Sequence, residues 1–563
     1  MKQWLSVGIL GLLFCKPVMA DQMNLKVVYP RADYETTADR IFLIGTAPSN
    51  GDVVLNGERI QERSVSGHFA PTVPLKIGKN IFSLRYREES ITLTVNRLPT
   101  LTAPPQNVGF VTGSIEPAVN LVRLPNEPIC FKAIALPKAQ VSVQVAQQTI
   151  DLLAQPQAFD LPANAAVLTQ TSNPIAAAPS TMLYQGCTTF AVPSDLGKPT
   201  FYFKQGKTTI SQQGAGPISI LSPQSIQVVE VTSEQGTARS GPSTDYSRLT
   251  PLPQGTRAQV TGRDGEWLRL DYGGWIKQSE TKPVVNGSMP RSLIRSVRVK
   301  TLADRTDVLF PLQVPVPITV QQNDDEFRLT LFNTTAQTDT IAQTPGPVLS
   351  RLDWQQRSPG QVEYRLKLKS KHQWGYRLRY EGTTLVLSLR HPPSLGSKQM
   401  PLAGTSILLD PGHGSANDLG SVGPTGYPEK DVTLTVSKLL RQELERKGAR
   451  VIMTREGDED LYPADRVKRI EKEVPTLALS LHYNALPDNG DAWRTQGVST
   501  FWYHPQAQDL AVFLHDYLVR TLHRPSYGVY WNNLALTRPA ITPAVLLELG
   551  FMINPTEFEW IAD

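Results

Sequence analysis

The stretch LLDPGHGSANDLGSVGPTGYPEKDV, residues 408–432, decides how the last part of the chain folds. Its apolar residues lead into an aspartate and are then broken by Pro411, a pattern typical of a buried strand that stops at a loop. His413 then stands between two glycines, and the loop leads to a lone Glu429. A loop with only a structural role needs neither side chain, whereas histidine nitrogens and carboxylate oxygens are both metal ligands. The stretch therefore predicts a strand that delivers residues to a metal site.

Strand patterns alternate with helix patterns on the C-terminal side of this first strand, and Gly448 is placed to end the first helix. The predicted strands are 405–410, 449–455, 476–482, 498–504 and 543–551, and the predicted helices are 431–448, 465–473 and 508–522. This alternation predicts an α/β three-layer domain with a largely parallel sheet. In such sheets, sites collect at the carboxyl ends of the strands.

Four polar residues fall at that rim of the predicted sheet. His413 follows the first strand, and His482 ends the third. Glu548 lies near the end of the last strand, and Glu429 comes from the loop before the first helix. Two imidazoles and one carboxylate match the ligand set of a catalytic zinc, which keeps its fourth position for water. Glu548 follows two leucines, where a carboxylate is costly unless it is used, and is predicted to be the base; the alternative is a structural glutamate bound by backbone or arginine.

Four ordered motifs of this domain match a known family: LLDPGHG, GYPEKDV, SLHYNA and PAVLLELGFMIN. Together they resemble the zinc-dependent N-acetylmuramoyl-L-alanine amidases of the type 3 amidase family, and the resemblance covers residues 404–563 almost throughout. It implies that His413, Glu429 and His482 hold Zn²⁺ and that Glu548 is catalytic. It also implies hydrolysis of the peptidoglycan amide that joins the lactyl group of N-acetylmuramic acid to L-alanine.

Three more residues carry weaker predictions. Asn484 and Arg538 lie in or near the matched motifs and either contact substrate or hold structure. Asp410 either orients a metal ligand through a hydrogen bond or is simply the last residue of its strand. The sequence also departs from the family pattern: Ser415 stands where many relatives have a third glycine, and little chain follows NPTEFEWI, so the family's final helix is expected to be short or missing.

The chain before residue 404 is predicted to form several small β domains, because 563 residues are too many for a single core. PTVPLKIGKNIFSLRY resembles part of an immunoglobulin-like (Ig-like) accessory domain. Arg239, Trp267 and the Gly274-Trp275 pair fit a bacterial SH3-like barrel, and DEFRLTLFN with its neighbouring strands resembles an AMIN-type β domain. The predicted divisions are a signal peptide at 1–20, an Ig-like sandwich at 21–98, a second β domain at 99–225, the SH3-like barrel at 226–283, the AMIN-like domain at 288–392, a linker at 393–403 and the hydrolase domain at 404–563.

The first twenty residues, MKQWLSVGILGLLFCKPVMA, have a basic start, an apolar run and small residues before Ala20, which predicts a secretory signal peptide. No later run reaches the ~20 apolar residues of a spanning helix. The mature protein is therefore expected in the periplasm or at the cell wall; lipidation of Cys15 is the weaker alternative, because bulky Phe14 precedes it. Cys130 and Cys187 are then expected to form a disulfide, the alternative being two buried thiols.

The net charge of the mature chain limits the classes of partner that it is expected to bind. Loss of Lys2 and Lys16 with the signal peptide lowers the formal charge from +5 to +3, which is too near neutral to indicate nucleic acid. Peptidoglycan is the expected partner, and envelope or division proteins are candidates for the β domains. Two other functions stay open: a zinc peptidase that cuts within the stem peptide, and a degenerate hydrolase that only binds the wall.

Overall fold

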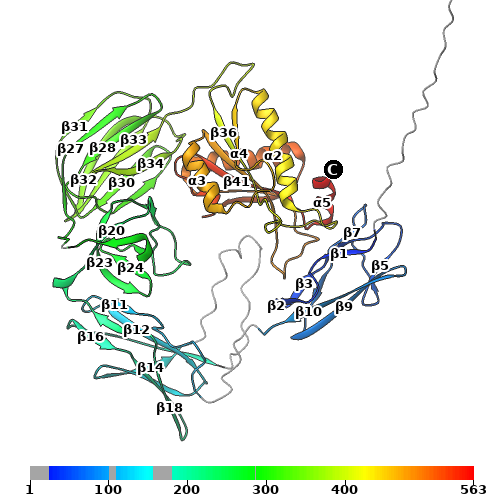
Figure 1. Cartoon of the computed structure of the whole chain (residues 1–563), viewed down its shortest axis with the longest axis horizontal. Coiled ribbons are helices and arrows are strands. Elements are labelled where there is room, and N and C mark those ends of the chain that lie inside the picture. Colours follow the sequence, from blue (N-terminus) through cyan, green and yellow to red (C-terminus); the bar gives the residue numbers. More distant parts are fainter. Residues whose placement is uncertain (1–23, 100–108, 156–180, 286) are drawn as a thin grey trace, which may run out of the picture.

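The computed structural model describes residues 24–99, 109–155, 181–285 and 287–563. The predicted signal peptide at 1–20 lies outside the described residues. The chain is mostly β, with an α/β domain at its C-terminal end (Figure 1). Within the described residues, no helix is both long and apolar enough to cross a membrane.

The first unit, residues 24–99, packs its strands around one apolar core. Its two larger sheets have the strand orders β1-β4-β7 and β2-β10-β9-β5-β6, and β3 pairs with β8. The strands are β1 (Lys26–Tyr29), β2 (Tyr34–Thr36), β3 (Arg40–Phe42), β4 (Ile44–Thr46), β5 (Val53–Leu55), β6 (Glu58–Arg59), β7 (His68–Phe69), β8 (Thr72–Pro74), β9 (Gly78–Tyr86) and β10 (Glu89–Arg97).

The second unit contains a six-stranded antiparallel sheet in the order β12-β15-β14-β13-β17-β18. Cys130 and Cys187 lie directly opposite each other in β12 and β15 and are joined by a disulfide. The strands are β11 (Leu121–Arg123), β12 (Pro128–Ala135), β13 (Gln140–Val145), β14 (Gln148–Ala154), β15 (Met182–Thr189), β16 (Ser194–Gly197), β17 (Thr200–Gln205), β18 (Thr208–Gln213) and β19 (Ile218–Ile220).

The third unit is the small barrel, and its sheet continues into the second unit. β11 pairs with β23 across Leu121 and Asp264, so strands from both sides of residue 225 share one sheet. A separate core fills the barrel itself. Its elements are η1 (Pro223–Ser225), β20 (Val228–Val231), β21 (Gln235–Gly236), β22 (Leu252–Pro253), β23 (Arg257–Asp264), β24 (Trp267–Leu270), β25 (Trp275–Lys277), η2 (Gln278–Glu280) and β26 (Thr281–Pro283).

The fourth unit, residues 288–392, holds a large apolar core between two sheets of order β31-β27-β28-β35-β34 and β29-β30-β33-β32. It contacts the C-terminal domain through Arg377, whose guanidinium lies 3.0 Å from the carboxylate of Glu471. The strands are β27 (Ser292–Thr301), β28 (Arg305–Pro311), β29 (Ile318–Gln322), β30 (Glu326–Phe332), β31 (Thr334–Gln343), β32 (Leu349–Ser358), β33 (Gln361–Leu368), β34 (Tyr376–Glu381) and β35 (Thr384–Arg390).

The C-terminal domain is a six-stranded sheet of order β37-β36-β38-β41-β39-β40 with helices on both faces. Successive residues of β36 point to opposite faces, as in any strand: Leu409 packs against α2, and Leu408 packs with Ile470 of α3. Only the β39–β41 pairing is antiparallel. The elements are β36 (Ser406–Pro411), α2 (Glu429–Arg446), β37 (Arg450–Met453), α3 (Pro463–Glu473), β38 (Leu477–Asn484), β39 (Val498–Trp502), η3 (Pro505–Ala507), α4 (Gln508–Leu522), β40 (Ser526–Trp531), η4 (Ala535–Thr537), β41 (Ala544–Phe551) and α5 (Pro555–Ala562).

The first unit packs against the C-terminal domain, although the two lie at opposite ends of the chain (Figure 1). Phe42 and Ile44 share a buried apolar cluster with Phe551 and Ile553, which follow or end β41. Lys26 donates a hydrogen bond of 2.7 Å to the carbonyl of Thr425. The contact therefore reaches the segments that directly precede α2 and directly follow β41.

Candidate metal centre

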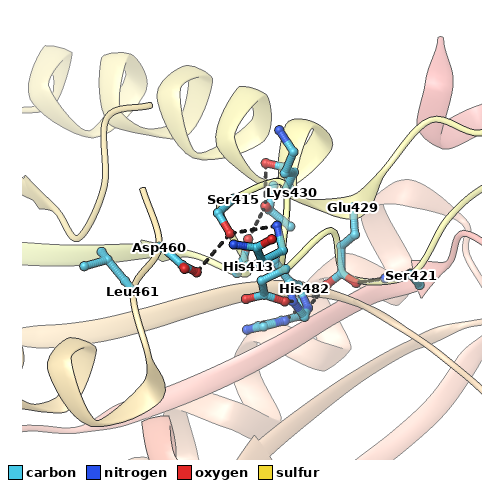
Figure 2. Close-up of polar contacts among 12 residues, drawn as sticks. His413, Ser415, Ser421, Glu429, Lys430, Asp460, Leu461 and His482 are labelled. Atoms are coloured by element: carbon cyan, nitrogen blue, oxygen red, sulfur yellow. Dashed lines mark hydrogen bonds and ion pairs between the residues drawn. The ribbon is translucent and has the colours of Figure 1, made fainter. Parts of the chain in front are cut away.

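His413, Glu429 and His482 come together at the carboxyl edge of the sheet, and their candidate ligand atoms all lie within 4.8 Å of one another. Figure 2 shows both imidazoles directed toward the carboxylate of Glu429. Glu429 Oε1 lies 3.2 Å from His413 Nε2 and 3.1 Å from His482 Nδ1. Among the residues that the structure describes, no other group of three or more histidine, cysteine or acidic side chains has this geometry.

Glu429 is the first residue of α2, so it does not come from a loop before the helix as predicted. A carboxylate at a helix N-terminus faces the positive end of the helix dipole. Its Oε2 accepts hydrogen bonds from the backbone N–H (2.8 Å) and hydroxyl (3.1 Å) of Ser421, and its Oε1 accepts one from the N–H of Tyr483 (2.9 Å). Burial raises the pKa of Glu429, but the two imidazoles outweigh burial and hold it far below its ordinary value. The carboxylate is therefore fixed and ionised.

His413 is oriented from behind by Asp418, whose Oδ1 lies 2.6 Å from the His413 Nδ1. This bond leaves Nε2 to face Glu429 and the shared site. Burial lowers the pKa of His413. The carboxylates of Glu429 and Asp418 outweigh burial and raise this pKa to about 9. Gly412 makes the arrangement possible, because a Cβ at this position would lie 2.4 Å from Cε1 of His482.

Glu548 lies beside His482, its register partner on the neighbouring strand. Its Oε2 is buried and has no hydrogen-bond partner among the described residues. Burial raises the pKa of Glu548 well above its ordinary value, and repulsion from Glu429 raises it further. A buried carboxylate oxygen without a partner among the described residues, close to His482 and Glu429, is costly unless a further group binds there. The donor set and this orphaned oxygen together fit a catalytic zinc with an attacking water.

Asp410 is buried and forms no hydrogen bond to either imidazole within the described residues. It forms an ion pair of 2.7 Å with Arg466, which also donates to the carbonyls of Pro411 and His413. A second buried arginine, Arg455, donates to the carbonyls of Pro411 and Gly412. Asp410 thus acts on the histidine loop only indirectly, through Arg466.

The two residues predicted to contact substrate lie in different places. Asn484 follows His482 by two residues, and its side-chain oxygen accepts a hydrogen bond from the N–H of Ala485. Arg538 follows η4 and precedes β41, so it lies toward the opposite edge of the sheet from the cluster. Its guanidinium donates to the side chain and carbonyl of Asn533. The structure therefore brings Asn484 near the cluster and separates Arg538 from it.

Sequence reasoning missed Asp418, Ser421 and the two buried arginines. Asp418 could have been found, because it is an acidic residue that follows His413 within the same glycine-rich loop. Arg455 and Arg466 carry no such signal, since an arginine after a strand or on a helix is most often exposed.

An α/β sheet with a His–Glu–His cluster at its carboxyl edge and a free carboxylate beside it has the arrangement of a metal-dependent hydrolase. Residues 407–563 match the profile of the N-acetylmuramoyl-L-alanine amidase family, and residues 227–282 match that of the bacterial SH3 domain. The chain belongs to the N-acetylmuramoyl-L-alanine amidase family, and its barrel is an SH3-like domain.

Several named relatives are similar to the C-terminal domain. The germination-specific N-acetylmuramoyl-L-alanine amidase of Bacillus subtilis is 36% identical over 180 residues, which cover 28% of this chain and 71% of that protein. The probable cell wall amidase LytH of Staphylococcus aureus is 36% identical over 165 residues, 29% of this chain and 53% of that protein. The catalytic domain of CwlV, an amidase from Bacillus (Paenibacillus) polymyxa var. colistinus, is 27% identical with a TM-score of 0.27, covering 28% of this chain and 87% of that structure.

Proposed function

We propose that residues 404–563 hydrolyse the amide between the lactyl group of N-acetylmuramic acid and the first L-alanine of the peptidoglycan stem peptide, with zinc as cofactor. Membership of the amidase family supports the reaction class. The observation that carries the proposal is the convergence of His413, Glu429 and His482 within 4.8 Å, beside the unpaired oxygen of Glu548. Zinc bound by these three residues would supply a Lewis acid that activates water near neutral pH and polarises the lactyl carbonyl.

The protein's own residues prepare the site for this reaction. Asp418 fixes the ring of His413, and the hydrogen bonds from Ser421 and Tyr483 fix the carboxylate of Glu429, so little reorganisation is needed when a ligand binds. In our proposal Glu548 accepts a proton from the attacking water and delivers it to the alanine nitrogen as the carbon–nitrogen bond breaks. The products are a lactyl carboxylate on the sugar and a free amine on the stem peptide.

The substitution Glu548→Gln in the full-length chain tests this assignment. We expect the zinc content to stay at the wild-type level and the digestion of purified peptidoglycan to fall by about 10²–10⁴-fold, because a general base is removed while the three ligands remain. Glu445→Gln, an exposed position on α2, is the matched control. Near-normal digestion by Glu548→Gln would contradict the assignment of the base.

Mass analysis of the released peptides separates the amidase from the two other functions. An amidase releases stem peptides that keep their N-terminal alanine and carry no sugar, whereas a zinc peptidase releases shortened peptides. A chain that only binds the wall releases neither. Zinc analysis of the same preparation shows whether the site holds a metal.

We further propose that the chain acts outside the cytoplasm, in the periplasm or at the wall, after removal of residues 1–20. The name of the LytH relative, a probable cell wall amidase, supports this location. For the first and fourth units we propose Ig-like and AMIN-like domains that place the enzyme on the wall or on envelope proteins. Their support is the two-sheet packing around a single core in each unit.

A further inference from the structure

A cavity with polar and apolar walls lies where the SH3-like barrel and the fourth unit meet the C-terminal domain. Two adjoining hollows of about 450 and 400 Å³ share Arg248, Tyr503, Trp531 and Arg538 among their lining residues. Tyr503 follows β39, and Trp531 ends β40. Since β39 runs antiparallel to β41, these strand ends lie at the edge of the sheet opposite the His–Glu–His cluster. The cavity is therefore separate from the metal centre.

Three arginines line this arginine cavity: Arg239 and Arg248 from the barrel, and Arg538 from the C-terminal domain. None of them forms an ion pair with a carboxylate among the described residues. Burial, followed by the positive charges of Arg248 and Arg239, lowers the pKa of Arg538 to about 10. One acidic residue, Asp245, also lines the cavity, but it is exposed and bonds to Ser243. Like charges gathered without a counterion favour the binding of an anion.

The arginines do not serve to join the two domains. Arg239 donates to the carbonyls of Thr244 and Tyr246 within the barrel, and its buried Nε has no partner in the part of the chain that the structure describes. Arg538 donates only to Asn533 of its own domain, and the Arg248 side chain makes no hydrogen bond among the described residues. Each guanidinium thus keeps donors that a ligand could use.

Aromatic rings complete the wall of the arginine cavity. The ring of Trp531 lies 5.2 Å from that of Tyr503 and is 61% exposed. Its indole N–H donates to the carbonyl of Tyr503, which fixes the plane of the ring. A fixed, exposed aromatic surface beside guanidinium groups suits a ligand with both an apolar face and a carboxylate.

We propose that the arginine cavity is a second ligand site, which binds a carboxylate-bearing fragment of peptidoglycan. The ligand's identity rests on the proposed function: hydrolysis of the lactyl amide leaves a carboxylate on each processed sugar, and the stem peptide carries carboxylates of its own. A volume of about 450 Å³ accommodates a disaccharide or a short peptide. The arginine cavity would bind a cleaved or a neighbouring peptidoglycan strand while the metal centre hydrolyses an amide at another position.

Calorimetric titration of the full-length chain tests the proposal with defined probes. The first is the disaccharide N-acetylglucosaminyl-N-acetylmuramic acid with its free lactyl carboxylate, and the second is the dipeptide L-alanyl-D-glutamate. The neutral chitin disaccharide and inorganic phosphate serve as comparisons. Arg248→Gln and, independently, Trp531→Ala remove the two kinds of contact, and Arg263→Gln is the matched control, because it lies on the same barrel outside the cavity.

We expect saturable binding of at least one carboxylate probe, weakened about tenfold or more by Arg248→Gln and by Trp531→Ala and unchanged by Arg263→Gln. Which probe binds identifies the glycan or the stem peptide as the source. Equal binding by wild type and both cavity variants, binding of phosphate alone, or no binding of either carboxylate probe would overturn the proposal. Neither carboxylate probe contains the scissile amide, so a failure of hydrolysis is a separate result that bears on the proposed function alone.

Discussion

Asp418 is the residue that contacts the outer nitrogen of the His413 ring. The Nδ1 of that ring contacts Asp418 at 2.6 Å, and the ring's other nitrogen faces Glu429. A ligand histidine held in one orientation by a carboxylate binds its metal more tightly, because the favourable tautomer is already present. The Asp418 side chain is 45% exposed, so its substitution should leave the folded core intact.

We therefore predict that Asp418→Asn weakens zinc binding by about 10–100-fold. Competition with a chromophoric chelator measures the affinity directly. Asp460→Asn is the control, since Asp460 lies nearby and bonds to Ser415 without contacting His413. Unchanged zinc affinity in Asp418→Asn would show that the contact does not orient the ligand.

At this scale the sequence predicts the residues that carry chemistry better than those that support them. His413, Glu429 and His482 stand in motifs where their chemistry is unusual for a strand end or a loop. Asp418 is an ordinary loop aspartate until the fold turns it toward the ring. The sequence could not show that Arg538 lies away from the metal centre. The antiparallel pairing of β39 with β41 places Arg538 at the opposite edge of the sheet, and this pairing leaves no signal in the sequence.

At the scale of elements, α3 helps to hold the end of β36. Arg466 of this helix reaches back to Asp410 and to the carbonyls of Pro411 and His413, and the ion pair is almost fully buried, at 4% and 1% exposure. Burial raises the pKa of Asp410, but Arg466, Ser480 and Thr454 outweigh it and hold that pKa below its ordinary value. The helix thus fixes the loop that carries the first histidine.

We predict that Arg466→Ala lowers the free energy of unfolding by about 3–5 kcal/mol, because it leaves Asp410 buried without its countercharge. Urea denaturation at neutral pH measures the loss. Loss of Arg466 raises the pKa of Asp410 relative to wild type, so the variant's carboxylate is protonated at a higher pH. The stability difference from wild type should therefore begin to narrow at that higher pH and should go on narrowing as pH falls to the lowered wild-type pKa of Asp410.

Arg469→Ala on the same helix is the matched control. Its exposed ion pair with Glu473 should contribute only about 0.3–0.5 kcal/mol. Equal stability losses in Arg466→Ala and Arg469→Ala would mean that the buried pair does not hold the loop.

Most elements of the C-terminal domain follow from sequence periodicity, but their edges do not. The first helix begins at Glu429, two residues before the predicted start, because Pro428 is extended and the carboxylate is bonded within the first turn. The shared sheet of the second and third units was not predictable, since pairing of Leu121 with Asp264 depends on tertiary contact and leaves no periodic signal. The motif NPTEFEWI itself forms the short helix α5, and the expectation that the family's final helix is short or missing stays a prediction.

At the scale of the whole molecule, the chain returns on itself so that its first unit touches the catalytic domain (Figure 1). Asp488 lies in the loop after β38 and accepts hydrogen bonds from the hydroxyls of Tyr29, Tyr34 and Thr36. These partners are more than 450 residues apart, so no local pattern could reveal the contact. The loop begins directly after His482 and Asn484, which makes the first unit a support for one wall of the site.

We predict that Asp488→Ala reduces the free energy of association between the first unit and the C-terminal domain by about 1–3 kcal/mol, because three hydroxyl groups lose their acceptor at a half-buried position. Amide hydrogen exchange followed by mass spectrometry should show faster exchange in residues 26–46 and 485–494 together, with the fourth unit unchanged. Asp491→Ala is the matched control, since the Asp491 side chain, among the described residues, contacts Arg494 of its own loop and no group of the first unit. If exchange rises in residues 485–494 alone, the loop has lost a local hydrogen bond while the first unit stays bound through its apolar contacts. That result would contradict the prediction that Asp488 is needed for the first unit to support the site.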